Sequence, residues 1–140
     1  MEIINGERLV LGTCYYPEHW DESLWRDDLK RMLENGIEVI RIAEFAWSKI
    51  ERYEGVFNYG FFDRFLDVAA DMGMKVIFCT PTATPPAWLT EKYPEVLNAN
   101  MDGVLYRHGG RRHYNYNSPK YQELTTIIVE KSASHYAKHP

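Results

Sequence analysis

The 140-residue sequence predicts an α/β fold built around a parallel sheet. Three short apolar runs have the composition of strands, and segments with helical periodicity separate them. Helices at this spacing between apolar strands are typical of βαβ units, in which the strands run parallel. The length corresponds to about one domain, and no internal repeat or low-complexity linker divides the chain.

The first strand is expected at residues 8–14, and it should be buried. Asp21 stands where a helix N-cap residue belongs, so a helix is predicted over 22–35, closed by an Asn-Gly pair. The second strand follows at 37–43, where β-branched residues predominate. These three elements form the first βαβ unit.

The second helix is expected at 61–72 and the third strand at 75–80. A Pro-rich loop then runs into a short helix, and the polar segment 98–117 shows no periodicity. Loops of this length inside a compact domain are uncommon and usually functional. Ser118, followed by proline at the first helical position, predicts a last helix over 119–137.

The sequence ends where a fourth strand would be expected to begin. Without that strand, the first and third strands keep unpaired edges. We therefore expect residues 1–140 to be the front of a larger α/β domain, with no second domain and about three βα units.

Composition and charge exclude several classes of function. The net charge of −4 is unfavourable for binding a nucleic-acid backbone, and no apolar run is long enough to span a membrane. Cys14 and Cys79 lie far apart and form no CxxC pair, which predicts buried free thiols in a reducing compartment. The first residues lack the basic and apolar regions of a signal peptide, so a cytoplasmic location is expected.

Arg41 lies between two isoleucines of the second predicted strand. If both isoleucines face the helices, Arg41 faces the interior of the fold, where a guanidinium must be paired. Glu44 follows at the carboxyl end of the same strand, which is where active sites form in parallel barrels. Two interpretations stay open: a structural Arg–Glu pair, or part of an active-site floor.

Aromatic residues make up 14% of the chain and gather after the predicted strands. Trp20, Trp47 and Trp88 each follow one of the three strands, and His19 precedes the first of these tryptophans. Each tryptophan fits either a sugar-stacking platform or a packed core. His19 fits either proton transfer or a structural hydrogen bond.

The segment 109–115 places two adjacent arginines, Arg111 and Arg112, between a glycine pair and His-Tyr-Asn. A guanidinium offers a planar fork of donors that suits carboxylates and neighbouring hydroxyls. The alternative interpretation is a solvated surface. The five histidines show no HExxH arrangement, and no P-loop, GxGxxG or GxSxG motif is present.

Five segments of the chain, in order, resemble the N-terminal third of the β-galactosidases of glycoside hydrolase family 42. They are Gly12–Trp20 (Gly-Thr-Cys-Tyr-Tyr-Pro-Glu-His-Trp), Arg41–Trp47 (Arg-Ile-Ala-Glu-Phe-Ala-Trp), Glu54–Phe57, Thr80–Leu89 and Gly110–Tyr114. The resemblance covers nearly the whole chain. It implies that residues 1–140 are the N-terminal portion of a (β/α)8 TIM barrel.

The resemblance also implies a function for the larger protein: retaining hydrolysis of terminal β-galactosides, often by a homotrimer. The two catalytic glutamates of the family would lie beyond Pro140, so residues 1–140 alone are expected to be inactive. One sugar-binding residue is carried over, Arg111, the first arginine of the Arg-Arg-His-Tyr motif. In some members the first cysteine of a zinc site follows that motif, and here the position is Asn115, so we expect no metal and no other cofactor.

Two other functions remain compatible with the sequence. One is a different retaining glycosidase on the same type of barrel. The other is a non-catalytic sugar-binding or assembly module. Neither the natural galactoside nor the roles of Arg41, Glu44 and the three tryptophans follows from the sequence.

Overall fold

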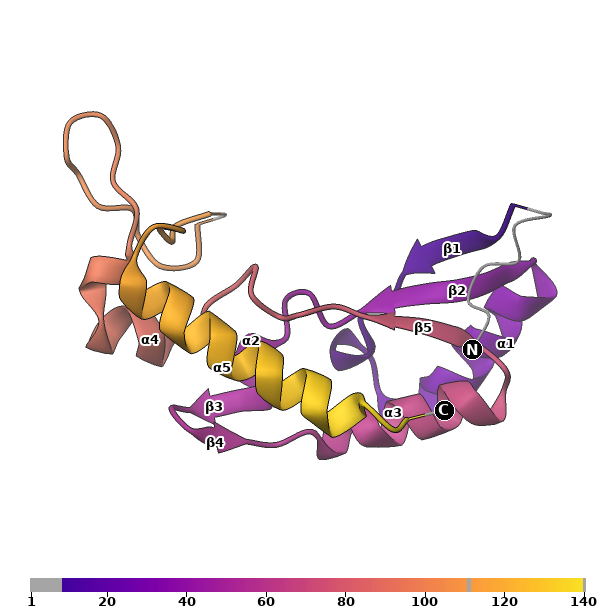
Figure 1. The fold of residues 1–140 in the computed structure, drawn as a ribbon. Coiled ribbons are helices and arrows are strands. Elements are labelled where there is room, and N and C mark those ends of the chain that lie inside the picture. Colours follow the sequence, from indigo (N-terminus) through magenta and orange to yellow (C-terminus); the bar gives the residue numbers. More distant parts are fainter. Residues whose placement is uncertain (1–8, 111, 140) are drawn as a thin grey trace. The chain divides into compact units, whose positions relative to one another are not determined.

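The structure is a computed structural model that describes residues 9–110 and 112–139 (Figure 1). These residues divide into two compact units. The first comprises the chain up to Ala43 together with Tyr59–Cys79, and the second comprises Glu44–Asn58 together with the chain from Thr80 onward. Among the helices of the described residues, none is both long and apolar enough to cross a bilayer.

The first unit is a three-stranded parallel sheet with two helices. Strands β1 (Leu11–Cys14), β2 (Ile37–Ile42) and β5 (Lys75–Phe78) lie in the order β1-β2-β5, and both pairings are parallel. The three strands predicted from the sequence are therefore confirmed. The central strand β2 supplies the hydrogen bonds for both neighbours, so β1 and β5 are the edges of this sheet.

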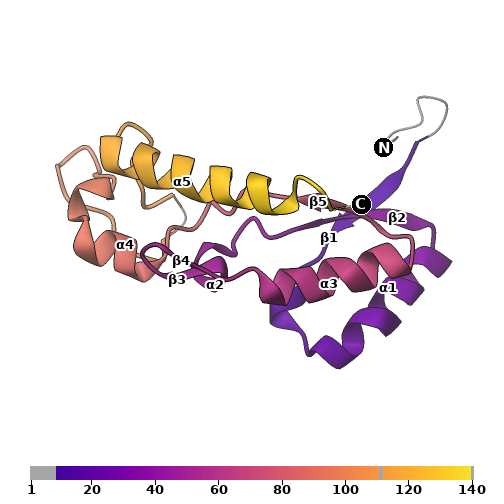
Figure 2. The same ribbon diagram turned by 60° about the horizontal axis from the view of Figure 1, so that its bottom comes forward.

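Helices α1 (Trp25–Glu34) and α3 (Gly60–Asp71) lie on the same face of this sheet (Figures 1 and 2). The predicted helix start is confirmed at Asp21, whose carboxylate accepts the backbone N–H of Ser23 at 2.9 Å. The first turn, Glu22–Leu24, is a 3-10 turn rather than α-helix.

An aromatic cluster joins the helices to the end of β1. Trp25 meets Phe61 and Phe65 edge-on, at ring-centre distances of 5.2 and 5.1 Å. Tyr15 stacks on Phe65, and its hydroxyl donates to Asp28 at 2.8 Å. Edge-to-face aromatic pairs contribute about 0.5–1.5 kcal/mol each beyond the area they bury. This cluster is the core of the first unit.

Arg41 is exposed, and the prediction that it is buried is wrong. The alternation itself holds, because Ile40 and Ile42 are fully buried and Arg41 lies on the opposite face. Within this unit both helices pack on the isoleucine face, so the other face is left without cover. The register places Cys14 and Ile77 beside Arg41 in one exposed row of that face.

Two further burial predictions fail for related reasons. The first strand is exposed along its whole length, because β2 is its only paired neighbour in the sheet. The free thiols are not buried either: Cys14 is exposed with the row just described, and Cys79 is half-buried at the end of β5.

The second unit is built from short elements and one long helix. A single helical turn, α2 (Trp47–Ile50), leads into the hairpin β3 (Glu51–Tyr53) and β4 (Val56–Phe57), which the sequence analysis did not predict. The short helix predicted after the Pro-rich loop is α4 (Ala87–Lys92), and a 3-10 turn follows it at Pro94–Val96. The predicted last helix is confirmed as α5 (Pro119–Tyr136).

A buried carboxylate organises the beginning of this unit. Glu51 is 3% exposed and accepts the indole N–H of Trp47 and the backbone N–H of Gly55, each at 2.7 Å. Gly55 has a φ of 78°, a left-handed conformation that glycine adopts at little cost. Trp88 donates its indole N–H to the backbone oxygen of Glu51 at 3.0 Å. One acidic residue thus ties α2, the hairpin turn and α4 together.

Removing the aromatic centre of the first unit should destabilise the protein strongly. Phe65 is fully buried and contacts both Tyr15 and Trp25. Phe65→Ala is expected to lower the free energy of unfolding by about 3–5 kcal/mol, because it leaves a cavity that the cluster cannot fill. Urea unfolding followed by fluorescence measures the loss. Phe61→Ala, at a half-buried position, should cost clearly less, and equal losses would contradict this assignment of the core.

Candidate functional site

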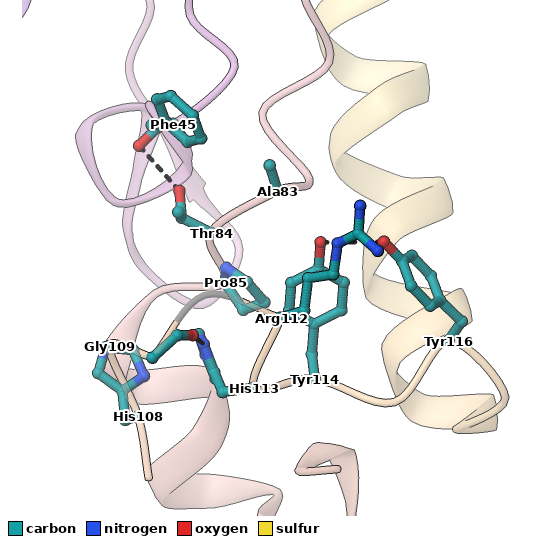
Figure 3. Close-up of a pocket in the computed structure, with 11 residues that line it drawn as sticks. Phe45, Ala83, Thr84, Pro85, His108, Gly109, Arg112, His113, Tyr114 and Tyr116 are labelled. Atoms are coloured by element: carbon teal, nitrogen blue, oxygen red, sulfur yellow. Dashed lines mark hydrogen bonds between the residues drawn. The ribbon is translucent and has the colours of Figure 1, made fainter. Parts of the chain in front are cut away.

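A cavity of about 420 Å³ opens in the second unit (Figure 3). Its walls come from the loop after β2, the Pro-rich loop after β5 and the polar loop before α5. Two of these loops leave the carboxyl ends of parallel strands, and such loops carry the active sites of parallel barrels. The residues around it are Phe45, Ala83, Thr84, Pro85, His108, Gly109, Gly110, Arg112, His113, Tyr114 and Tyr116.

The polar segment that supplies most of these residues is held by backbone pairing. Asn98 donates its N–H to the carbonyl of His113 at 2.7 Å, and Asn115 donates to Val96 at 2.8 Å. Antiparallel bridges join Leu97 to Tyr114 and Ala99 to Leu105. The sequence shows no periodicity here because the paired residues lie far apart along the chain. The loop is therefore anchored at the cavity rather than free along its length.

Asn115, which follows the Arg-Arg-His-Tyr motif, has a structural role. Its side-chain oxygen accepts the backbone N–H of Asn117 at 2.9 Å, which closes a turn before α5. Among the described residues, no three His, Cys, Asp or Glu side chains are grouped so that they could hold a metal ion.

Hydrogen bonds determine which nitrogen of each cavity histidine carries its proton. Thr90 donates its hydroxyl hydrogen to the carbonyl of Ala87 at 3.1 Å, so its oxygen accepts from Nδ1 of His108 at 2.9 Å. Nδ1 of His113 lies 2.6 Å from the carbonyl of Gly110 and must donate to it. Nδ1 is thus the hydrogen-bonded nitrogen of each ring.

The environment of His108 favours its neutral form. Burial lowers the pKa of His108, and the neighbouring His113 lowers it further, while Glu91 opposes the change. The two rings meet edge-on at a centroid distance of 4.9 Å. His113 is only 3% exposed, and its Nε2 has no hydrogen-bond partner among the described residues.

Tyrosines form the wall nearest α5. Tyr114 stacks on Tyr121 at a centroid distance of 4.8 Å, and its hydroxyl lies 3.3 Å from the hydroxyl of Tyr116. Tyr121 is fixed in turn by a 2.8 Å hydrogen bond to the carbonyl of Thr82. Burial raises the pKa of Tyr114 well above its ordinary value, so this phenol stays neutral. These groups can donate and accept hydrogen bonds without adding negative charge.

Arg112 is the charged side chain of the cavity wall. Its backbone φ of 60° lies in the left-handed region, which costs a residue with a side chain about 1–2 kcal/mol. Figure 3 shows its guanidinium reaching toward the hydroxyl of Tyr116. Among the described residues it has no carboxylate partner, in contrast to Arg26 and Arg64, which pair with Asp71 and Glu22.

Arg111, the predicted substrate-binding residue, lies outside the described residues. Both of its neighbours in the chain, Gly110 and Arg112, line the cavity. The loop that carries the predicted residue therefore does border a cavity, while the role of Arg111 itself stays a prediction.

The three tryptophans have different surroundings. Trp47 is fully buried with its N–H satisfied by Glu51, which is the core interpretation. Trp88 is half-buried and hydrogen-bonded to the same residue's backbone. Trp20 is 54% exposed, as a residue that stacks on a sugar ring would have to be. His19 is exposed beside Tyr16, at a ring-centre distance of 5.4 Å.

Several wall residues were not identified from the sequence. Glu44 was a candidate and is buried, but its neighbour Phe45 is the residue that reaches the cavity. The hydroxyl of Thr84 donates to the carbonyl of Phe45 at 3.0 Å, which ties two walls together. Their signal in the sequence was their position just after two strands, and the aromatic and Pro-rich composition there was interpreted only as a loop.

The parallel βαβ arrangement, with a polar and aromatic cavity in the loops that follow its strands, defines the first part of a (β/α)8 enzyme barrel. The profile of the Glyco_hydro_42 family, described as β-galactosidase, matches residues 14–140, and the chain belongs to this family.

Characterised relatives and solved structures agree with this assignment. The chain is 46% identical over 127 residues to β-galactosidase BgaA of a Thermus species, covering 91% of this chain and 20% of that protein. It is 42% identical over 130 residues to β-galactosidase Bga of Halorubrum lacusprofundi, covering 93% and 19%. The crystal structure of a β-galactosidase from the psychrophilic Marinomonas ef1 superposes with a TM-score of 0.90 at 42% identity, covering 94% and 20%.

The resemblance and the barrel fold predicted from the sequence are thereby confirmed. The chain spans about a fifth of the length of these relatives, a smaller share than the third expected from the motifs.

The neutral state of His108 should make stability depend on pH. The unfolded chain has the ordinary histidine pKa of about 6.5, and the folded pKa is lower, so between the two values the unfolded state binds more protons. Stability is then fully present above about pH 6.5 and falls as the pH drops through that window.

Urea unfolding at about pH 7.5 and about pH 5.5 measures this effect in the protein that carries the chain. His108→Gln should reduce the loss of stability on acidification, because glutamine does not titrate in this range. An unchanged pH dependence in His108→Gln would contradict the assignment.

Proposed function

We propose that the protein that includes this chain is a retaining β-galactosidase that hydrolyses terminal, non-reducing β-galactosides. The observation that carries the proposal is the family match over residues 14–140, together with identities above 40% to two proteins named as β-galactosidases. The chain contributes the first βα units of the barrel and part of the loop wall around the sugar.

A retaining glycosidase needs two carboxyl groups about 5–5.5 Å apart, one as nucleophile and one as acid and then base. Among the described residues around the cavity there is no carboxylate. The catalytic pair is therefore assigned to strands that follow residue 140, as the resemblance implies. The part of this chain in the reaction is to bind and orient the sugar, which aids catalysis by placing the bond that breaks beside those carboxylates.

Within this scheme Arg111 is a substrate-binding residue that donates hydrogen bonds to galactose hydroxyls. Support comes from its place in the Arg-Arg-His-Tyr motif and from the two neighbours that line the cavity. A guanidinium presents its donors in a plane, which matches two adjacent hydroxyl oxygens.

We further propose that the protein is cytoplasmic and assembles as a homotrimer. The resemblance supports the trimer, and the loop that includes Met101, Val104 and Leu105 carries an exposed apolar tip. Apolar groups gathered at such a tip favour contact with another protein surface. Light scattering on the purified protein measures the assembly, and a monomer at micromolar concentration would oppose the trimer.

Activity should separate the chain from the larger protein. The full-length protein is expected to hydrolyse a chromogenic β-galactoside with retention of the anomeric configuration, which proton NMR of the first-formed sugar detects. Residues 1–140 alone should show only background hydrolysis, because the carboxylate pair is not in them. Hydrolysis by the isolated chain, or inversion by the full-length protein, would overturn this assignment.

Removing Arg111 should weaken transition-state binding without unfolding the protein. In the full-length protein, Arg111→Ala is expected to lower kcat/KM for the galactoside by an amount equivalent to about 1–3 kcal/mol, the scale of leaving hydrogen-bonding groups unpaired. Arg31→Ala, at an exposed position on α1, is the control and should leave kcat/KM unchanged. An unchanged kcat/KM in Arg111→Ala would mean that Arg111 does not bind the sugar and that the motif is a solvated surface.

A further inference from the structure

We propose that the cavity around Arg112 binds a carboxylate-bearing sugar unit, such as a uronic acid residue of a glycan. The proposal rests on the proposed function only in taking the ligand to be a sugar. It assigns a role to the second arginine of the motif, for which the sequence analysis left a solvated surface as the alternative.

The first argument is the unsatisfied charge of Arg112. The side chain lines the cavity, and among the described residues it has neither a hydrogen bond nor an ion pair. Its backbone φ of 60° lies in the left-handed region, which is uncommon for a residue other than glycine. A guanidinium donates two parallel hydrogen bonds to a carboxylate, and such bidentate pairs are among the strongest polar contacts.

The second argument is the charge of the remaining wall. None of the described residues that line the cavity is a carboxylate, and Glu91, which acts on His108, lies outside the lining. The other titratable groups of the lining beside Arg112 are two histidines and two tyrosines, and burial keeps the phenol of Tyr114 neutral. A ligand with one negative charge therefore meets a complementary field.

The third argument concerns the sugar ring that would carry the carboxylate. Phe45, Tyr114 and Tyr116 present aromatic surface to the cavity, and the apolar face of a pyranose packs on such surfaces. At about 420 Å³ the cavity lies within the usual range for small-molecule sites.

Direct binding measurements on the full-length protein test the proposal. Isothermal titration calorimetry with D-galacturonate, D-galactose and acetate separates the contributions of charge and ring. The native protein should bind galacturonate at least tenfold more tightly than either galactose or acetate. Arg112→Asn removes the cation while asparagine tolerates the left-handed backbone, so the fold should persist, which thermal unfolding checks.

In Arg112→Asn the preference for galacturonate over galactose should fall by about 10-fold or more, the scale of a charge-assisted hydrogen bond. Arg107→Ala removes an equal charge from the same loop outside the cavity wall and should keep the preference. Hydrolysis of a neutral chromogenic galactoside, assayed in parallel, reports separately on the proposed function.

Three outcomes would overturn the proposal. One is a native protein with no preference for galacturonate over galactose. Another is acetate binding as tightly as galacturonate, which would mean a plain anion site. The third is an equal loss of preference in Arg107→Ala and Arg112→Asn, which would reduce the effect to overall loop charge. Each of these outcomes is compatible with galactosidase activity, so each refutes the cavity assignment alone.

Discussion

The central strand β2 imposes the main constraint on the first unit. It is paired on both sides, so its hydrogen bonds set the register of β1 and β5 together. Burial of Ile40 and Ile42 against the helices then decides which face of all three strands is covered. A one-residue slip would reverse every side chain of the strand. The direction of the loops at its carboxyl end follows from this register.

The fold of the family to which the chain belongs explains the exposed row on the opposite face. Cys14, Arg41 and Ile77 lie side by side on the face away from the helices, which is the interior face in a (β/α)8 barrel. An arginine there is too polar for a simple core and stands near the end of the barrel where active sites form. The burial expected from alternation requires strands beyond the three described here.

The cavity of the second unit is stabilised by contacts behind its wall and by hydrogen bonds within the wall, such as the one from Thr84 to the carbonyl of Phe45. Glu51 holds the loop after β2 through Trp47 and the turn at Gly55, and the tyrosine stack holds the other wall. The hydrogen-bonding and aromatic groups that hold these parts of the wall thus find their partners within the protein. Arg112 lines the cavity without an ion pair among the described residues, so its guanidinium is available to a ligand.

The sequence by itself determined the class of fold, the three parallel strands, the capped helices and the family, because these depend on local periodicity, capping residues and contiguous motifs. It could not determine burial at Arg41, Cys14 or Leu11, because exposure depends on which elements cover a face and not on alternation alone. The β3–β4 hairpin was also not predicted, because its strands are too short to show the two-residue alternation of a strand. Only the tertiary structure brought Phe45, Thr84 and Arg112 to one cavity, because those residues come from three loops separated along the chain, and their proximity is set by long-range pairing rather than by any local pattern.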